Sequence, residues 1–287
     1  MPIVPAAGFL PFEFDVLLIG RWPLIIVGMI ILIRLLQPRS KVTLPEVARE
    51  AVFVVGAFLL YSLVRNNVDG REVEAVQRAL RLIDMEQALG IFREPEMQRE
   101  VLASPRLMNV ANGIYVWAHF PVIIFTGIWL FTIHRDDYPV YRNAFLISGA
   151  IGLAVYATLP VAPPRFVEGF GFVDTLAFRE SAQQMSLPGA WVNEYAAVPS
   201  LHLGWNFLAG IAIYRHMPYA PLKPLGLLMP AAMFFSIVAT GNHFIIDGLA
   251  GMAVAALALM VALAIRSLVH EGYAQGNRRL AAWSSFV

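Results

Sequence analysis

Long blocks of apolar residues recur along the chain, and they constrain its fold more than any other feature. We find such blocks at residues 14–36, 47–64, 108–133, 144–159, 200–214, 225–239 and 244–265. An α-helix of about 20 residues crosses the roughly 30 Å hydrocarbon core of a bilayer. Charged residues make up only 14% of the chain, whereas a soluble domain carries about 25%. The sequence therefore predicts an all-α, polytopic transmembrane helix bundle of about six to seven spans.

Charge and cysteine content exclude several classes of function. The net charge of +1 gives no reason to expect nucleic acid binding, and the absence of cysteine excludes disulfides, thiolate metal sites and a cysteine nucleophile. No basic region precedes the first apolar block, so we expect no cleaved signal peptide. With no internal repeat, one membrane domain is expected over residues 1–287. It divides into N-terminal spans and an amphipathic segment at 14–107, a helix bundle at 108–267 and a cytoplasmic tail at 268–287.

The positions of Lys and Arg predict the orientation of the spans. With seven spans, the basic loops and the C-terminal tail all fall on one side of the membrane. Their charges are Arg39 and Lys41, Arg135 and Arg142, Arg215 and Lys223, and Arg278 and Arg279. The positive-inside rule makes that side cytoplasmic. Residues 65–107, the loop at 160–199 and the turn at 241–243 are then extracytoplasmic.

Two long segments outside the apolar blocks have their own character. Residues 68–89 place apolar residues at helical spacing with Arg and Glu between them, which predicts an amphipathic helix at the membrane surface. Residues 165–197 mix glycines, aromatics and charges. That segment is too polar to span the membrane and too aromatic for a linker, so we expect an extracytoplasmic cap loop.

The last apolar block begins with a histidine and an aspartate four residues apart, in GNHFIIDGLAG. This spacing places His243 and Asp247 on one face of the predicted helix. A carboxylate there can fix the imidazole tautomer and stabilise its charged form, as a nucleophile or general base requires. The alternative is a structural hydrogen bond, but ionisable groups in membrane spans are costly and therefore good functional candidates.

Two further motifs occur at the predicted outer ends of neighbouring spans. His202 follows Pro199 and Ser200 at a predicted helix start, where exposed amides and the hydroxyl can bind an anion. Arg165 follows two prolines after the fourth block, and its guanidinium matches phosphate oxygens. Each alone could be an ordinary interfacial residue. Together with His243 they predict a phosphate site containing two histidines.

In this order, Arg165, Pro-Ser-Leu-His at 199–202 and His243 with Asp247 resemble the type 2 phosphatidic acid phosphatase superfamily, over residues 144–265. The resemblance implies that His243 attacks phosphorus and forms a phosphohistidine, that Asp247 orients it, and that His202 protonates the leaving oxygen. It also implies that Arg165, Ser200 and Asn242 bind phosphate oxygens, and that neither metal nor cofactor is needed. The implied partners are a lipid phosphate or phospholipid in the bilayer of a bacterial plasma membrane.

Two departures from the family pattern bear on the substrate. Thr158 stands where the family has a lysine, and Ile237 where it has an arginine. The pattern resembles more closely the branch of inositol phosphorylceramide synthases and their bacterial relatives, which implies head-group transfer between lipids. Fewer cations suit a less charged phosphodiester donor, with a polyol or sugar hydroxyl as a possible acceptor.

Three weaker candidates and two alternative functions remain open from the sequence. His119, Tyr195 and Arg179 are candidate substrate-binding residues. The spacing of His119, His202 and His243 also permits a haem-binding redox protein. A transporter is the other alternative, although it would be expected to show internal symmetry and charges near the middle of its spans.

Overall fold

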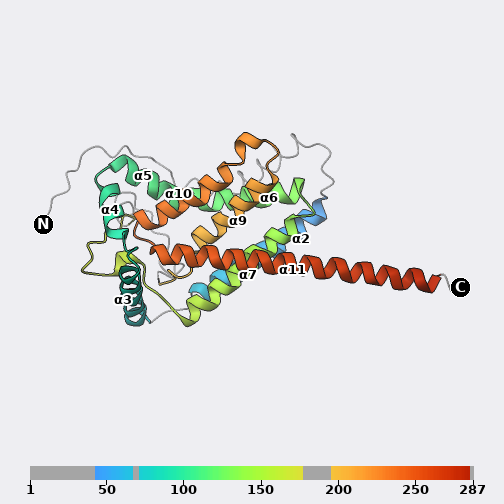
Figure 1. Ribbon diagram of the computed structural model, residues 1–287, viewed down its shortest axis with the longest axis horizontal. Helices are drawn as coiled ribbons and strands as arrows, with labels where there is room; N and C mark the ends of the chain where they lie inside the picture. Colours follow the sequence, from blue (N-terminus) through green and yellow to red (C-terminus); the bar gives the residue numbers. More distant parts are fainter. Residues whose placement is uncertain (1–42, 67–70, 177–194, 285–287) are drawn as a thin grey trace.

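The computed structural model describes residues 43–66, 71–176 and 195–284 as an assembly of helices (Figure 1). The helices are α2 (Leu44–Asn66), α3 (Glu72–Ala88), α4 (Glu94–Leu102), α5 (Pro105–Gly113), α6 (His119–Ile133), α7 (Tyr138–Thr158), α9 (Leu201–His216), α10 (Leu225–Ala239) and α11 (Ile245–Ser284). A π-helical turn, Ile114–Ala118, joins α5 to α6. Short 3₁₀ turns occupy Pro164–Phe166 and Ala220–Leu222. The described residues form no β-strand, so the predicted all-α class is confirmed.

Four helical stretches of the described chain are long and apolar enough to cross a membrane. They are Pro105–Ile133, Tyr138–Thr158, Ala220–Ala239 and Ile245–Glu271. Four predicted blocks, at 108–133, 144–159, 225–239 and 244–265, fall in these stretches. The blocks at 47–64 and 200–214 form α2 and α9, which are helical but do not meet the same test. The block at 14–36 lies outside the described residues.

Helix α9 is the central helix of the bundle, which accounts for its modest length of 16 residues. It packs against α6, α7, α10 and α11, and its buried residues lie all round its axis. They are Leu201, Leu203, Gly204, Asn206, Leu208, Ala209, Gly210, Ala212 and Ile213. A helix covered by protein on every side does not need the uninterrupted apolar surface that lipid contact requires.

Glycines allow α9 to approach its neighbours closely. A Cβ on Gly210 would overlap the carbonyl oxygen of Gly226 in α10, and a Cβ on Gly226 would overlap that of Gly210. On the side of α11, a Cβ on Gly204 would lie 2.6 Å from the carbonyl oxygen of Gly251. Small residues at helix crossings are typical of membrane bundles, where packing rather than water exclusion drives association.

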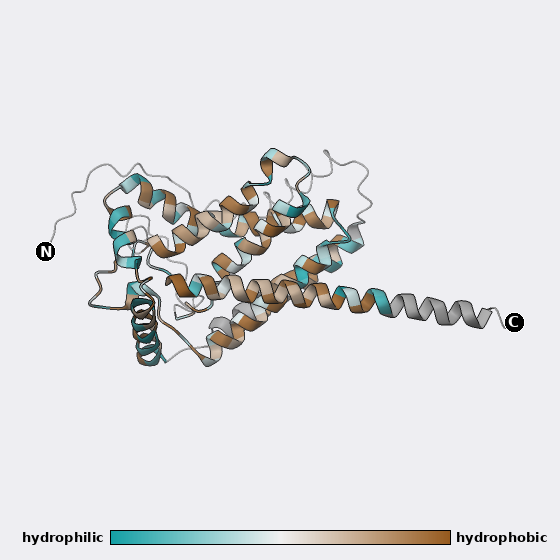
Figure 2. Ribbon diagram, in the orientation of Figure 1, coloured by the Kyte–Doolittle hydropathy of each residue, from teal (hydrophilic) through white to brown (hydrophobic). Residues whose placement is uncertain are grey.

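The outer surface of the bundle is apolar along much of its length. Figure 2 shows hydrophobic residues over most of α10 and over α11 up to about its middle. Several large side chains there are more than half exposed, including Leu227, Leu228 and Met260. Apolar exposure on this scale fits contact with acyl chains.

Charged residues join the helices at the end of the bundle where α6 finishes and α7 begins. The Arg142 guanidinium lies 2.9 Å from the Glu50 carboxylate of α2. Asp137 lies 2.6 Å from Arg266 of α11. The N-terminus of α11 lies at the other end, beside α3 and α4 (Figure 1).

The predicted amphipathic helix at 68–89 is present as α3, but its buried face contacts protein. Ala75, Ala79 and Ile83 are buried in one cluster with Val161, which follows α7, and Phe244, which precedes α11. This face therefore packs on the loops that precede α9 and α11, and the position of α3 at the membrane surface stays a prediction. Helix α3 is part of the wall around the start of α11.

Candidate active site

The first turns of α9 and α11 are held together by backbone contact. The Ser200 N–H donates to the Asp247 carbonyl at 2.9 Å. Gly251, one turn further along α11, lies directly against the Ser200 backbone, and a Cβ there would overlap the Ser200 carbonyl oxygen. This packing brings the Pro-Ser-Leu-His motif of α9 to the start of α11, beside His243.

His243 lies two residues before α11, which begins at Ile245. The expectation that His243 and Asp247 share one helix face is therefore wrong, because His243 is in the preceding turn. Its Nδ1 lies 2.9 Å from the carbonyl oxygen of Ala197 and 3.5 Å from Asp247 Oδ2. A carbonyl oxygen only accepts, so Nδ1 carries a hydrogen, and in the neutral imidazole the lone pair is then on Nε2.

Asp247 has a second partner at the helix start. Its Oδ2 accepts the Phe244 N–H at 2.8 Å, which is the reach-back half of a capping box. The Asp247 side chain is fully buried. The carboxylate therefore fixes the backbone next to His243 as well as facing the imidazole.

His202 lies in a stack of rings. Its centroid is 5.8 Å from that of His243, 4.5 Å from that of Tyr115 and 4.4 Å from that of His119. Tyr115 lies within the π-helical turn, and His119 follows that turn directly. Such turns recur at functional sites because they alter the direction of the side chains that follow. Sequence reasoning missed Tyr115, which has no motif of its own.

His119 is buried and has a defined hydrogen-bond partner. The Asn206 side-chain amide donates to His119 Nδ1 at 2.8 Å and also lies 2.8 Å from the His202 carbonyl oxygen. An amide N–H₂ can only donate, so Nδ1 accepts and Nε2 carries the hydrogen. Asn206 thus links His119 to the same turn of α9 that carries His202.

Arg165 is held close to His243 by the turn at 241–242. Its backbone N–H donates to the Gly241 carbonyl at 3.0 Å, and its guanidinium donates to Asn242 Oδ1. Arg165 Nε also lies 3.3 Å from Asp174 Oδ2. Gly241 has a φ of +69°, and a Cβ there would meet the Gln98 amide at 2.7 Å. The two predicted phosphate ligands, Arg165 and Asn242, therefore contact each other.

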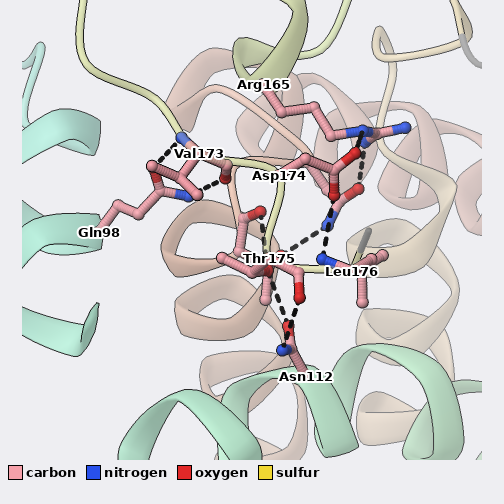
Figure 3. Close-up of polar contacts among 9 residues, drawn as sticks. Gln98, Asn112, Arg165, Val173, Asp174, Thr175 and Leu176 are labelled. Carbon is pink, nitrogen blue, oxygen red and sulfur yellow. Dashed lines mark hydrogen bonds and ion pairs between the residues drawn. The ribbon is translucent and has the colours of Figure 1, made fainter. Parts of the chain in front are cut away.

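The segment that carries Asp174 is clamped by two helices (Figure 3). The Gln98 side chain of α4 exchanges two hydrogen bonds of 2.9 Å with the Val173 backbone. The Thr175 hydroxyl donates to Asn112 Oδ1 of α5 at 2.9 Å. These contacts fix the start of the predicted cap beside Arg165. Residues 177–194 of the cap, with Arg179, lie outside the described residues.

The remaining predicted residues also have defined positions. Ser200 is fully buried, and its hydroxyl has no hydrogen-bond partner in the described part of the chain. Tyr195 and Phe166 face each other with ring centroids 5.8 Å apart, in the wall of an open groove that reaches Arg165. Glu72 and Gln77 of α3 line the same groove. Across residues 43–66, 71–176 and 195–284, no group of three or more His, Asp or Glu side chains could hold a metal ion.

At the two positions where the family pattern has a lysine and an arginine, Thr158 and Ile237 make contacts within their own surroundings and do not reach the site. The Thr158 hydroxyl donates to the Ala154 carbonyl of its own helix at 2.7 Å. Ile237 is fully buried in an apolar cluster with Leu203 and Met233. Neither side chain supplies charge to the site.

Two carboxylates that sequence reasoning did not select also reach the start of α11. Glu94 Oε1 accepts the Ile245 N–H at 2.9 Å, and Glu86 Oε1 accepts the Ile246 N–H at 2.8 Å. Both side chains are fully buried. The sequence contained one indication for Glu86. It is three residues after Ile83, so this acidic residue falls on the apolar face of α3, where a charged side chain is unexpected.

Comparisons with known proteins identify one family and two similar proteins. The chain matches the PAP2 superfamily over residues 80–261. It is 29% identical over 164 residues to the phosphoinositol dihydroceramide synthase of Bacteroides thetaiotaomicron, covering 52% of this chain. The chain spans about half, 53%, of the length of that curated relative. The crystal structure of Aquifex aeolicus LpxE aligns with 58% of this chain and 93% of its own, at 15% identity and a TM-score of 0.41.

Proposed function

Because the chain belongs to the PAP2 superfamily, we propose that it is an integral membrane enzyme that transfers a phosphoryl group through a phosphohistidine on His243. The observation that carries this proposal is the state of His243. Its Nδ1–H is directed to the Ala197 carbonyl at 2.9 Å, which leaves the lone pair on Nε2. A neutral imidazole with a fixed tautomer is the form that can attack phosphorus.

In the first step, His243 Nε2 forms a bond to phosphorus and the bond from phosphorus to the lipid oxygen breaks. The protonated His202 gives its proton to that oxygen, so the lipid leaves as an alcohol. The ring centroids of His202 and His243 are 5.8 Å apart, so the two imidazoles are close enough to act on groups bonded to the same phosphorus atom. Asp247 stabilises the positive charge that develops on His243.

In the second step, the acceptor returns the enzyme to its starting state. The now neutral His202 takes a proton from the acceptor hydroxyl, whose oxygen bonds to phosphorus as the bond to Nε2 breaks. Water as acceptor gives hydrolysis, whereas a lipid hydroxyl gives head-group transfer. Arg165, Asn242 and the Ser200 hydroxyl are the proposed donors to the phosphate oxygens.

We infer that the donor is a phosphodiester and that the reaction is a transfer between lipids. Two observations support this. The positions of the family's additional cations hold Thr158 and the buried Ile237, so the site has less positive charge to offer a phosphomonoester dianion. The Bacteroides relative is also named as a synthase of a phosphoinositol lipid. The groove between Glu72, Gln77 and Tyr195 is the proposed place of the head group.

The proposal extends to the placement of the enzyme in the membrane. Residues 108–267 are the proposed catalytic bundle, and α2, α9 and the block at 14–36 bring the proposed number of spans to seven. The site faces the extracytoplasmic side, where the phosphate lies at head-group depth. Residues 165–197 then form the cap over the head group.

The decisive test replaces the nucleophile. His243→Ala should lower turnover of phospholipid donors by a factor on the order of 10³ or more, and orthovanadate should inhibit the wild type. His270→Ala, which removes an exposed histidine of α11, is the matched control and should keep wild-type activity. Donors and acceptors, with and without inositol, are screened by mass spectrometry of the lipid products. Wild-type turnover in His243→Ala would reject the mechanism.

A further inference from the structure

The start of α11 receives carboxylates from three separate parts of the chain. Asp247 accepts the N–H of Phe244, Glu94 of α4 that of Ile245, and Glu86 of α3 that of Ile246. The first amides of a helix have no partner within the helix and carry partial positive charge. Here three successive amides are each bound by a fully buried carboxyl group.

Within the described structure, each of the two glutamates has one buried carboxyl oxygen without a hydrogen-bond donor, and a shared proton would give both oxygens a partner. Glu86 Oε2 and Glu94 Oε2 are both buried, and no N–H or hydroxyl group of the described residues donates to either. If both carboxyl groups were ionised, their negative charges would repel each other beside two adjacent amides, and both Oε2 atoms would remain without a donor. One proton between the two groups turns both oxygens into partners.

The raised pKa of Glu86 also favours a proton on this pair. Burial raises the pKa of Glu86 to about 9, with further contributions from its hydrogen bond to Glu94 and from the charges of Glu94 and Asp247. The bond from the Ile246 N–H acts in the opposite direction. These contributions favour Glu86 as the member of the pair that holds a proton at neutral pH.

We propose that Glu86 and Glu94 form a carboxylic acid–carboxylate pair that positions His243 by fixing the first turn of α11. Glu86 donates its O–H to Glu94, and each group binds one amide of the turn that follows His243. The pair touches neither the substrate nor the imidazole, so both are positioning residues. Since they act through His243, this role rests on the proposed function.

The pair also explains why two extramembrane helices precede the bundle. Helix α3 packs on Phe244 through its apolar face, and α4 packs on α5 and α10. Their contacts converge on residues 244–246. His243 is thus held from one side by the Ala197 carbonyl and, through its own backbone, from the other side by α3 and α4.

The test separates positioning from general stability. Glu86→Ala should lower kcat about 10- to 100-fold, with KM within about twofold of wild type. This is the range known for residues that orient metal-binding side chains, and we expect a similar effect for residues that orient His243. Glu86→Gln should recover most of this loss, because its amide can donate to Glu94 while its oxygen accepts the Ile246 N–H. Asp84→Ala in α3 and Glu100→Ala in α4 remove exposed carboxylates of the same helices and should change neither constant.

Three outcomes would overturn the positioning role. One is a folded Glu86→Ala protein with wild-type kcat while His243→Ala is inactive; activity in His243→Ala would instead reject the proposed function. Another is a rise in KM alone. The third comes from infrared spectroscopy at neutral pH. This measurement compares the wild type with Glu86→Gln, so it tests the shared proton even if Glu86→Ala fails to fold. The wild type should show a C=O stretch of a protonated buried carboxyl that Glu86→Gln lacks, and identical spectra would contradict the shared proton.

Discussion

At the scale of single residues, Glu86 should make stability depend on pH. The pKa of this carboxyl is 4.5 in the unfolded chain and is raised to about 9 in the folded protein, chiefly by burial. The folded state therefore binds a proton that the unfolded chain has released. The resulting stabilisation is complete below about pH 4.5 and is lost progressively as the pH rises toward about 9.

Glu86→Gln removes this titration, because an amide does not ionise in that range. The melting temperature of the purified protein should fall from pH 5 to pH 9 in the wild type, and the slope should be smaller in Glu86→Gln. The other ionisable groups facing this position are Glu94 and Asp247, and both remain in the variant. Parallel curves for the two proteins would show that Glu86 is already ionised at neutral pH.

Residues with a local motif could be predicted from the sequence, and residues that act through distant contacts could not. The pairing of Asp247 with His243 was predicted from their spacing of four positions, even though the helix starts later than expected. The Ala197 carbonyl, which binds His243 Nδ1 across 46 positions, carries no side-chain signature. Glu86 is 160 positions from the amide that it binds. Only the packing of α3 against the loops brings such groups together.

At the scale of helices, the crossing of α9 and α11 should control activity. Gly251→Ala would place a Cβ against the Ser200 backbone, where the nearest atoms belong to the main chain and cannot rotate away. Overpacking of this kind costs about 1–3 kcal/mol. The shift should also break the bond from the Ser200 N–H to the Asp247 carbonyl and move His202 away from His243.

We therefore expect Gly251→Ala to fold with a lowered melting temperature and to lose at least tenfold in kcat. Gly127→Ala in α6 is the matched control, because a Cβ there meets no atom within 4 Å. An alanine replacing a helical glycine should by itself stabilise by about 0.5–1 kcal/mol. Wild-type activity in Gly251→Ala would mean that the two helices need not touch for the histidines to meet.

The helices also show where apolar periodicity stops being informative. The block at 200–214 was predicted as one of the spans, but its sequence does not reveal that α9 is the central helix. An apolar residue does not by itself indicate whether it faces lipid or protein, because lipid tails are as apolar as buried side chains. Glycines such as Gly204 and Gly210 carry the missing information, and their meaning depends on which helix lies opposite.

At the scale of the whole molecule, the two ends differ in the length of the segments that carry their basic residues. Arginines are paired at both ends: Arg71 and Arg78 with Glu74 at the end that carries the site, and Arg135 with Glu46 at the other. Long folded segments contribute little to the orientation of a membrane protein, whereas short basic loops dominate it. The short turn between α6 and α7 carries Arg135 and lies at the end opposite the site. This arrangement favours an extracytoplasmic site.

Cysteine labelling can test this orientation directly, because the chain contains no cysteine. Glu168 is exposed beside the site, and Asp136 is exposed in the turn at the opposite end. In spheroplasts, a membrane-impermeant maleimide should label Glu168→Cys at once and Asp136→Cys only after the membrane is opened. Asp136→Cys should keep activity, since Asp136 lies at the end of the bundle opposite the site, and labelling of Glu168→Cys is measured whatever its activity, because Glu168 lines the groove beside Arg165. The reverse pattern would put His243 at the cytoplasmic face, where the lipid donor and the acceptor would have to be drawn from the inner leaflet.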